Sequence, residues 1–149
     1  MSYICTSCGK ETPTSTFHNA CECGGLFSLP QDHLPLWQES LIDKSVWSQF
    51  RYHAFMNLDG DVWRRVSMGE GMTPIVSYNG NVFLKMDFMM PTLSFKDRGA
   101  ATLVSHMKAI GVKKCVQDSQ RQRRRGCCRL LRQKRYRLRN LRSRRHQPE

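Results

Sequence analysis

Alternating and helical patterns of hydrophobic residues define three consecutive segments in the middle of the chain. Apolar side chains alternate with polar ones across residues 81–87, which predicts a strand. Residues 94–110 carry apolar side chains at helical spacing and are followed by Gly111, a residue typical of the position just past a helix. Residues 112–118 predict a second strand, so this order predicts a right-handed βαβ unit with a parallel sheet. The apolar positions behind these predictions are Val82, Leu84, Met86, Ala100, Leu103, Val104, Met107 and Ile110.

Two further patterns lie before this unit. Residues 75–78 predict a short strand, and the Asn-Gly pair at 79–80 is a strong signal for a hairpin into the strand at 81–87. The segment from 29 to 59 is rich in aromatic residues, and we expect it to pack an irregular helical face against the α/β domain. The residues of that expected face are Trp37, Leu41, Val46, Trp47, Phe50 and Phe55.

The expected start of the helix places a lysine in an unusual position. Ser94 and Asp97 have the spacing of a capping box, which would put Lys96 in the first helical turn. A cation there opposes the helix dipole at a cost of about 0.3–1 kcal/mol. Lysines placed against this preference include those that react as amines in Schiff-base chemistry. An ordinary surface lysine is the alternative, and the spacing alone does not exclude it.

Four cysteines near the N-terminus have metal-ligand spacing. Cys5 and Cys8 form one pair, and Cys21 and Cys23 form a second after a 12-residue excursion. Four thiolates complete a tetrahedral zinc site, and such a small ribbon needs the metal to fold. The second pair is Cys-x-Cys instead of the commoner Cys-x-x-Cys, so His18 is an alternative ligand for one position. Reduced cysteines in a metal-free extension are the competing interpretation.

The excess of positive charge lies entirely in the last 30 residues of the chain. The formal net charge is +12, but residues 1–119 contain 11 basic and 11 acidic side chains, whereas residues 120–149 contain 13 and 1. A polycation of this kind binds nucleic acid nonspecifically, and its poverty in large apolar residues predicts disorder. No apolar run approaches the roughly 18 residues of a membrane span, and no basic-apolar leader is visible, so we expect a soluble, cytoplasmic protein.

Several motifs resemble those of threonine synthase, a pyridoxal-phosphate enzyme of the tryptophan-synthase-β fold type (fold type II). The sequence Ser-Phe-Lys-Asp-Arg-Gly at 94–99 is similar to the cofactor-lysine motif of that family. Ser-Met-Gly-Glu-Gly-Met-Thr-Pro at 67–74, Phe-Arg-Tyr at 50–52, Phe-Leu-Lys at 83–85 and Pro-Thr at 91–92 agree in the same order. Some members also carry an N-terminal cysteine ribbon, which favours structural zinc.

The resemblance implies a domain organisation and a chemistry. It implies a zinc-ribbon-like extension at 1–29, an incomplete pyridoxal-phosphate α/β domain at 30–119, and a basic tail at 120–149. It also implies a lyase that makes threonine from O-phosphohomoserine and water, with an amino-acid substrate and with the cofactor held as a Schiff base on Lys96. Met90 and Leu93 stand where the family has asparagine and glycine, so substrate specificity is less secure.

Two other classes of function remain open from the sequence. One is another enzyme of the same fold type, such as a threonine dehydratase or a β-replacement enzyme. The other is a zinc-ribbon module whose basic tail binds RNA or DNA, with Tyr136 stacking on a base. The second class leaves the motif around Lys96 unexplained. The sequence indicates no oligomeric state.

The basic tail has the composition of an Ala/Gly-rich segment read out of frame. The family continues with Ser-Gly-Asn-Ala-Gly after the strand, whereas this chain continues with Gln-Arg-Gln-Arg-Arg-Arg at 120–125. Permitted codons for residues 120–126, CAG CGG CAA CGC AGG CGC GGC, read one base later as Ser-Gly-Asn-Ala-Gly-Ala. We therefore expect a frameshift after Asp118 or Ser119, and an inactive fragment as its product.

Overall fold

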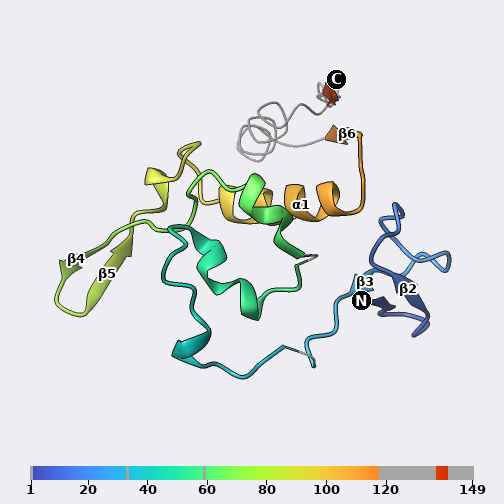
Figure 1. Cartoon of the computed structure of the whole chain (residues 1–149), viewed down its shortest axis with the longest axis horizontal. Helices are drawn as coiled ribbons and strands as arrows, with labels where there is room; N and C mark the ends of the chain where they lie inside the picture. The colour runs from blue at the N-terminus through green and yellow to red at the C-terminus, as the bar shows by residue number, and fades with distance from the viewer. Residues whose placement is uncertain (1, 33, 59, 118–136, 141–149) are drawn as a thin grey trace, which may run out of the picture.

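Short strands and short helices build the chain, and one α-helix lies at its centre (Figure 1). The computed structural model describes residues 2–32, 34–58, 60–117 and 137–140. The strands are β1 (Ser2–Cys5), β2 (Glu11–Pro13), β3 (Phe27–Ser28), β4 (Ile75–Asn79), β5 (Val82–Lys85), β6 (Lys114–Gln117) and β7 (Arg137–Asn140). The helix is α1 (Asp97–Ala109), and the 3-10 turns are η1 (Glu39–Leu41), η2 (Gln49–Phe55), η3 (Gly60–Arg65) and η4 (Asp87–Met89).

The N-terminal strands form a small antiparallel sheet in the order β2-β1-β3. Ile4 pairs with Glu11 on one side of β1, and Cys5 pairs with Phe27 on the other. This sheet and the two cysteine pairs, of which the first begins at the last residue of β1 and the second precedes β3, form the cysteine ribbon. None of the residues of the main hydrophobic core belongs to it, so packing alone gives the ribbon little stability.

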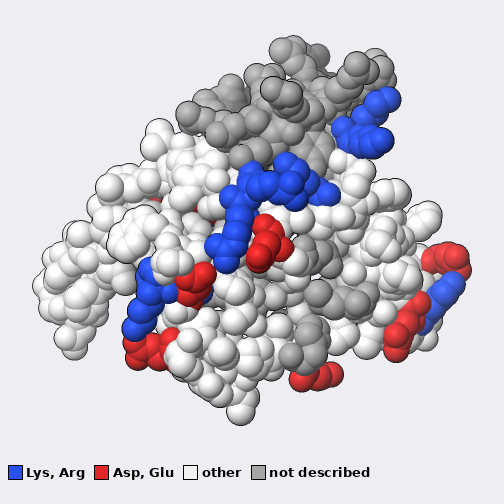
Figure 2. All heavy atoms as spheres, viewed as in Figure 1, with Lys and Arg blue, Asp and Glu red and all other residues white. Residues whose placement is uncertain are grey.

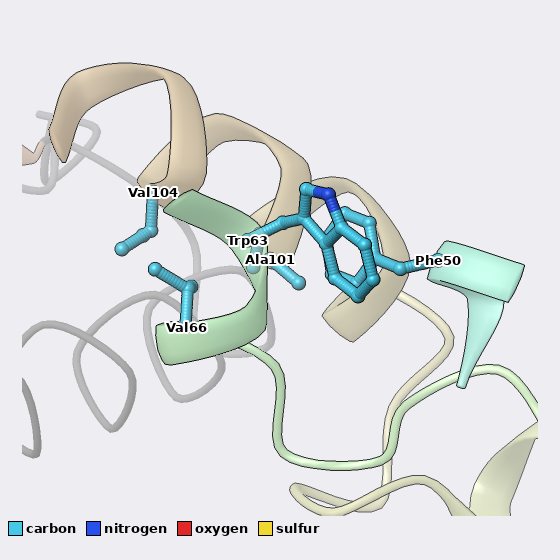
Figure 3. Packing of buried hydrophobic residues seen from close by; sticks show 6 residues of the cluster. Phe50, Trp63, Val66, Ala101 and Val104 are labelled. Carbon is cyan, nitrogen blue, oxygen red and sulfur yellow. The ribbon is translucent and has the colours of Figure 1, made fainter. Parts of the chain in front are cut away.

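The main core lies between α1 and the two central 3-10 turns (Figure 3). The rings of Phe50 in η2 and Trp63 in η3 stack with centroids 5.1 Å apart. Val66 faces Val104 across the same cluster in Figure 3, and both are completely buried. Ala100 and Ala101 allow α1 to approach closely. The aromatic segment thus packs on the helix as the sequence predicts.

The prediction of packed residues is wrong at two positions of the expected aromatic face and at one of the expected helix face. Trp37 and Trp47 are 66% and 74% exposed, and Leu103 of the expected helix face is 51% exposed. The segment consists of separate 3-10 turns, so helical spacing does not keep its residues on one side. In α1 the small Ala101 takes the buried place beside Val104 because η3 packs against that side of the helix.

The expected hairpin is present. β4 and β5 pair antiparallel with Asn79 opposite Val82, so the turn lies at 80–81, one residue later than expected, and Gly80 has a φ of +50°. Every residue of both strands is exposed, and the hairpin projects away from α1 at the end of the molecule opposite the cysteine ribbon (Figure 1). Isolated two-stranded hairpins are only marginally stable in water.

The predicted βαβ unit does not form within the described residues. β5 pairs only with β4, whereas β6 pairs with β7 in a separate two-stranded sheet. A parallel sheet between β5 and β6 would need both strands side by side with their faces covered, but η4 and a turn carry the chain away from β5 before α1 begins. The parallel pairing predicted for the second strand occurs instead with β7, from Lys114 with Arg137 to Gln117 with Asn140.

The helix starts later than predicted and ends where predicted. α1 begins at Asp97, with Lys96 as its N-cap, and no capping box forms. The Ser94 hydroxyl accepts from the Lys96 amide at 3.3 Å, because residues 94–97 make a separate turn before the helix. At the other end Gly111 has a φ of +78°, and the Val112 amide donates to the Met107 carbonyl at 2.9 Å. This is a Schellman termination.

Part of the basic tail is ordered strand. Residues 137–140 form β7, so the prediction of disorder is wrong for these four residues, whose backbone groups pair with the free edge of β6. The rest of the predicted disordered tail, including Tyr136, lies outside the described residues. Within the described ranges, no helix is both long enough and apolar enough to span a bilayer. Acidic and basic side chains are interspersed on the face shown in Figure 2.

Candidate functional site

The two motifs singled out in the sequence, at 67–74 and 94–99, meet at Arg98. Its guanidinium donates to both carboxylate oxygens of Asp87, Nη2 to Oδ1 at 3.0 Å and Nε to Oδ2 at 3.3 Å. Nη2 also donates to the Gly71 carbonyl at 3.1 Å. The Thr73 hydroxyl donates to the same Asp87 carboxylate at 2.7 Å. One arginine therefore ties the first turn of α1 to the turn at 67–74.

The charge pair changes the acidity of Asp87. Hydrogen bonds from Arg98, and then from Thr73, hold the pKa of the Asp87 carboxyl below its usual value against a smaller effect of burial. The Lys85 amine lies close enough to donate to the Thr73 carbonyl and adds positive charge. The carboxylate thus stays ionised at neutral pH and keeps Arg98 paired.

Glu70 is a buried carboxylate inside the turn at 67–74. It is 1% exposed, and it accepts from the Met68 amide at 2.7 Å and from the Ser67 hydroxyl at 3.1 Å. Burial raises the pKa of Glu70, although the Met68 amide opposes that effect. The Glu70 carbonyl accepts from the Gln49 amide at 2.7 Å. This turn is therefore an internal part of the fold and not only a surface turn.

Gln49 and Asp97 complete the frame around the start of α1. The Gln49 side-chain amide donates to the Arg98 carbonyl at 2.8 Å. Asp97 is buried and accepts from the Thr92 amide at 2.7 Å and from the Thr92 hydroxyl. The residue predicted to cap the helix thus fixes the preceding Pro-Thr segment instead. Asp97 and Arg98 thus brace the start of α1 against its neighbouring segments.

Lys96 lies at the N-cap of α1, between these fixed residues. Its Nζ atom is 4.0 Å from the centroid of the Phe95 ring, and it makes no ion pair within the described residues. A cavity of about 510 Å³ and one of about 350 Å³ lie along α1, and Lys96 lines neither. The structure thus holds the backbone of Lys96 firmly and leaves its amine outside both cavities.

The four predicted cysteine ligands converge at the end of the ribbon. The Sγ atoms of Cys5, Cys8, Cys21 and Cys23 all lie within 4.8 Å of one another. The Cys5–Cys23 and Cys8–Cys21 Sγ distances are 3.5 and 3.7 Å. Zinc–sulfur bonds of about 2.3 Å at tetrahedral angles require sulfurs about 3.8 Å apart. The donor set fits zinc, and His18 is not part of it.

Glycines allow the sulfurs to come this close. A Cβ atom on Gly25 would lie 2.6 Å from Cys5 Sγ and 2.6 Å from the Ser7 hydroxyl. Because real Cβ contacts are not this short, any larger residue at position 25 must displace the cluster. The absence of a side chain at Gly25 thus permits the tight fold of the backbone under the sulfurs.

The cluster shifts the acidity of two thiols in opposite directions. Amide hydrogen bonds from Cys8 and Ser7 lower the pKa of the Cys5 thiol to about 6. At Cys23 the Gly25 amide favours the thiolate, but the contacts with the other three sulfurs and burial outweigh it, raising the pKa to about 12.

Sequence reasoning missed the partners that connect these segments. It assigned no role to Asp87, Gln49 or His106, yet Asp87 pairs with Arg98 and the Tyr3 hydroxyl lies 3.2 Å from His106 Nε2. The only available signal was the position of Asp87 at the end of a predicted strand. Contacts across 49 and 103 residues leave no local pattern.

The described residues thus define a ribbon whose four cysteines are arranged as ligands for one metal ion, joined to a mixed helix and strand segment that presents a lysine at a helix start. The chain is similar to the threonine synthase of Methanocaldococcus jannaschii, with 29% identity over 119 residues. The match covers 72% of this chain but only 29% of that enzyme. No family model matches the chain, and no solved structure matches it.

Proposed function

We propose that the chain is a segment of a pyridoxal-phosphate lyase of the threonine-synthase type, with fold type II as the architecture of the whole enzyme. The observation that carries the proposal is that the turn at 67–74 and the segment 94–99 are joined by Arg98. Arg98 lies two residues after Lys96 and so fixes the backbone that carries this lysine. The similarity to the M. jannaschii enzyme supports the same assignment. The reaction would convert O-phosphohomoserine and water to threonine and phosphate.

Lys96 is the residue of this chain that would hold the cofactor. Attachment needs an amine without a competing carboxylate, and Lys96 meets that condition within the described residues. When bound, pyridoxal phosphate would supply the electron sink for loss of phosphate from the substrate γ-carbon and addition of water at the β-carbon. The Lys96 amine would move protons at the substrate, while Arg98 and Asp97 keep its backbone in place. The cavities along α1 do not include Lys96, so we propose that this chain alone is inactive.

Borohydride trapping tests the assignment of Lys96. The purified chain is incubated with pyridoxal phosphate and reduced, and the pyridoxyl adducts are located by mass spectrometry. We expect the adduct on Lys96 to dominate over Lys108, a matched lysine on the same helix, and to disappear in Lys96→Ala but not in Lys108→Ala. Equal labelling of both lysines would show that Lys96 is an ordinary surface lysine.

A reading-frame change is the proposed origin of the basic tail. The coding DNA decides this point. If the codons that begin at residue 120 are read with the frame shifted by one base, they must encode Ser-Gly-Asn-Ala-Gly. The frame-corrected protein would then be assayed with O-phosphohomoserine, threonine and O-acetylserine to separate the synthase from a dehydratase or a β-replacement enzyme. A DNA sequence without the alternative reading would contradict the frameshift.

Structural zinc is the proposed role of the cysteine ribbon. The geometry of the four sulfurs and the absence of ribbon residues from the main core support it. Metal analysis of the chain purified with zinc should give one zinc per chain, and Cys8→Ser should lower this stoichiometry. Full retention of zinc in Cys8→Ser would contradict a four-thiolate site.

A further inference from the structure

An aromatic contact joins the cysteine ribbon to α1. The Tyr3 hydroxyl lies 3.2 Å from His106 Nε2, and the two rings meet edge to face with centroids 6.4 Å apart. Tyr3 and His106 both line the cavities of about 510 and 350 Å³, so open space lies beside this contact. A contact outside the main core can open locally without disrupting that core.

Tyr3 is held in place by the same strands that carry the cysteines. Its ring stacks on Phe27 of β3 with centroids 5.3 Å apart, and Phe27 pairs with Cys5 across the ladder. The Thr6 amide donates to the Leu26 carbonyl at 2.9 Å, which closes the end of this ladder next to the sulfurs. If the sulfurs separate, the β1–β3 pairing loses its anchor and Tyr3 loses its stacking partner.

His106 lies on the helix that begins next to Lys96. The two residues are ten positions apart, which is about 15 Å along the axis of α1. His106 is only half-buried, whereas the core residues Ala101 and Val104 on the same helix are buried. The ribbon therefore contacts the C-terminal half of α1 at a site that the main core does not already fix.

We propose that metal binding by the four cysteines controls the docking of the ribbon on α1, with Tyr3 and His106 as the positioning residues of a metal-dependent clasp. With zinc bound, β1 and β3 hold Tyr3 against His106. The cavity of about 510 Å³ is then lined by residues of the N-terminal segment on one side and by residues of α1 on the other. Without zinc, the ribbon separates from α1 and the cavity loses the wall formed by Tyr3, Thr14 and Leu29. The clasp depends on the zinc site proposed above and not on the cofactor assignment.

Hydrogen exchange of the whole chain, with and without zinc, tests the clasp. Zinc is removed with a chelator and restored, and metal content is measured on the same samples. We expect removal to raise amide exchange by about fivefold or more in β1 and in residues 103–112, since loss of one hydrogen-bonded contact gives a change of that size. Exchange at Phe50 and Val66 should not change.

Two variants make the test specific. His106→Ala should still bind one zinc, but its exchange at 103–112 should already be high and should not respond to chelation. Lys108→Ala, the matched control on the same helix, should respond as the unmodified chain does. If His106→Ala does not fold, Tyr3→Phe replaces it, because this change removes only the hydroxyl group.

The outcomes separate the clasp from the zinc site. One bound zinc with no change at 103–112 on its removal would overturn the clasp and leave the zinc site standing. No bound zinc would overturn the zinc site, and the clasp with it. A uniform rise in exchange that includes Phe50 and Val66 would show global unfolding and would also overturn the clasp.

Discussion

Replacement of Gly71 by alanine should be strongly destabilising, because two separate costs meet at this residue. Gly71 has a φ of +107°, a conformation that side chains rarely adopt. A Cβ atom there would also lie 2.7 Å from the Gln49 Cβ and 2.8 Å from the Gln49 amide nitrogen. The first cost is about 1–2 kcal/mol, and the overlap adds about 1–3 kcal/mol.

A matched control separates the two costs. Gly69 has a φ of +82°, but a Cβ atom at this position would lie 3.9 Å from its nearest neighbour, the Trp47 carbonyl oxygen. Gly69→Ala therefore adds the backbone strain without the overlap and should cost only about 1–2 kcal/mol. The difference between the two variants measures the contact of Gly71 with Gln49.

Urea unfolding followed by tryptophan fluorescence, which includes that of the buried Trp63, gives the free energies. A loss of about 2–5 kcal/mol in Gly71→Ala is a large fraction of the 5–15 kcal/mol typical of a domain. Movement of Gln49 would also break its bond to the Arg98 carbonyl, so we expect weaker trapping at Lys96 in the same variant. Equal destabilisation by the two alanines would refute the close approach of Gly71 and Gln49.

Three further predictions concern charged groups. Asp87→Asn should lower the free energy of unfolding by about 1 kcal/mol at neutral pH. Because the pKa of Asp87 is lowered in the folded state, the difference in stability between the variant and the unmodified chain should vanish as the pH falls below about 4, as urea unfolding at each pH would show. The pKa of Glu70 is raised, so stability should fall as the pH rises from about 4, and Glu70→Gln should lack that fall; an unchanged slope would contradict the burial of the carboxyl. In the metal-free chain, thiolate absorbance should show a titration near pH 6 that Cys5→Ser abolishes, and zinc binding at pH 7.5 should release fewer than four protons by calorimetry in different buffers.

Local patterns in the sequence were sufficient for several elements. The Asn-Gly pair predicted the β4–β5 hairpin, and Gly111 marked the end of α1. The spacing of the cysteines predicted a cluster that the fold brings together. Each of these features depends on residues close in sequence, such as a turn that needs a positive φ or thiols on neighbouring knuckles.

Local sequence patterns did not predict the hydrogen-bond partner of a side chain that has two possible partners nearby. Ser94 and Asp97 have the spacing of a capping box, but Asp97 bonds to Thr92 and the helix starts at Asp97 instead. Both arrangements satisfy the carboxylate, and only the packing of the segment before the helix selects one. The strand pattern likewise predicted the strands themselves, but not that β5 and β6 lie in different sheets.

By itself, the sequence determined the hairpin, the C-terminal end of the helix, the grouping of the cysteines and the motifs that resemble threonine synthase. Only the tertiary structure decided that Arg98 joins Asp87 to Gly71, that Glu70 is buried, and that Tyr3 meets His106. The physical reason is separation along the chain. Hydrogen bonds and packing between residues 11 to 103 positions apart depend on how whole segments fold together, and no local periodicity encodes them.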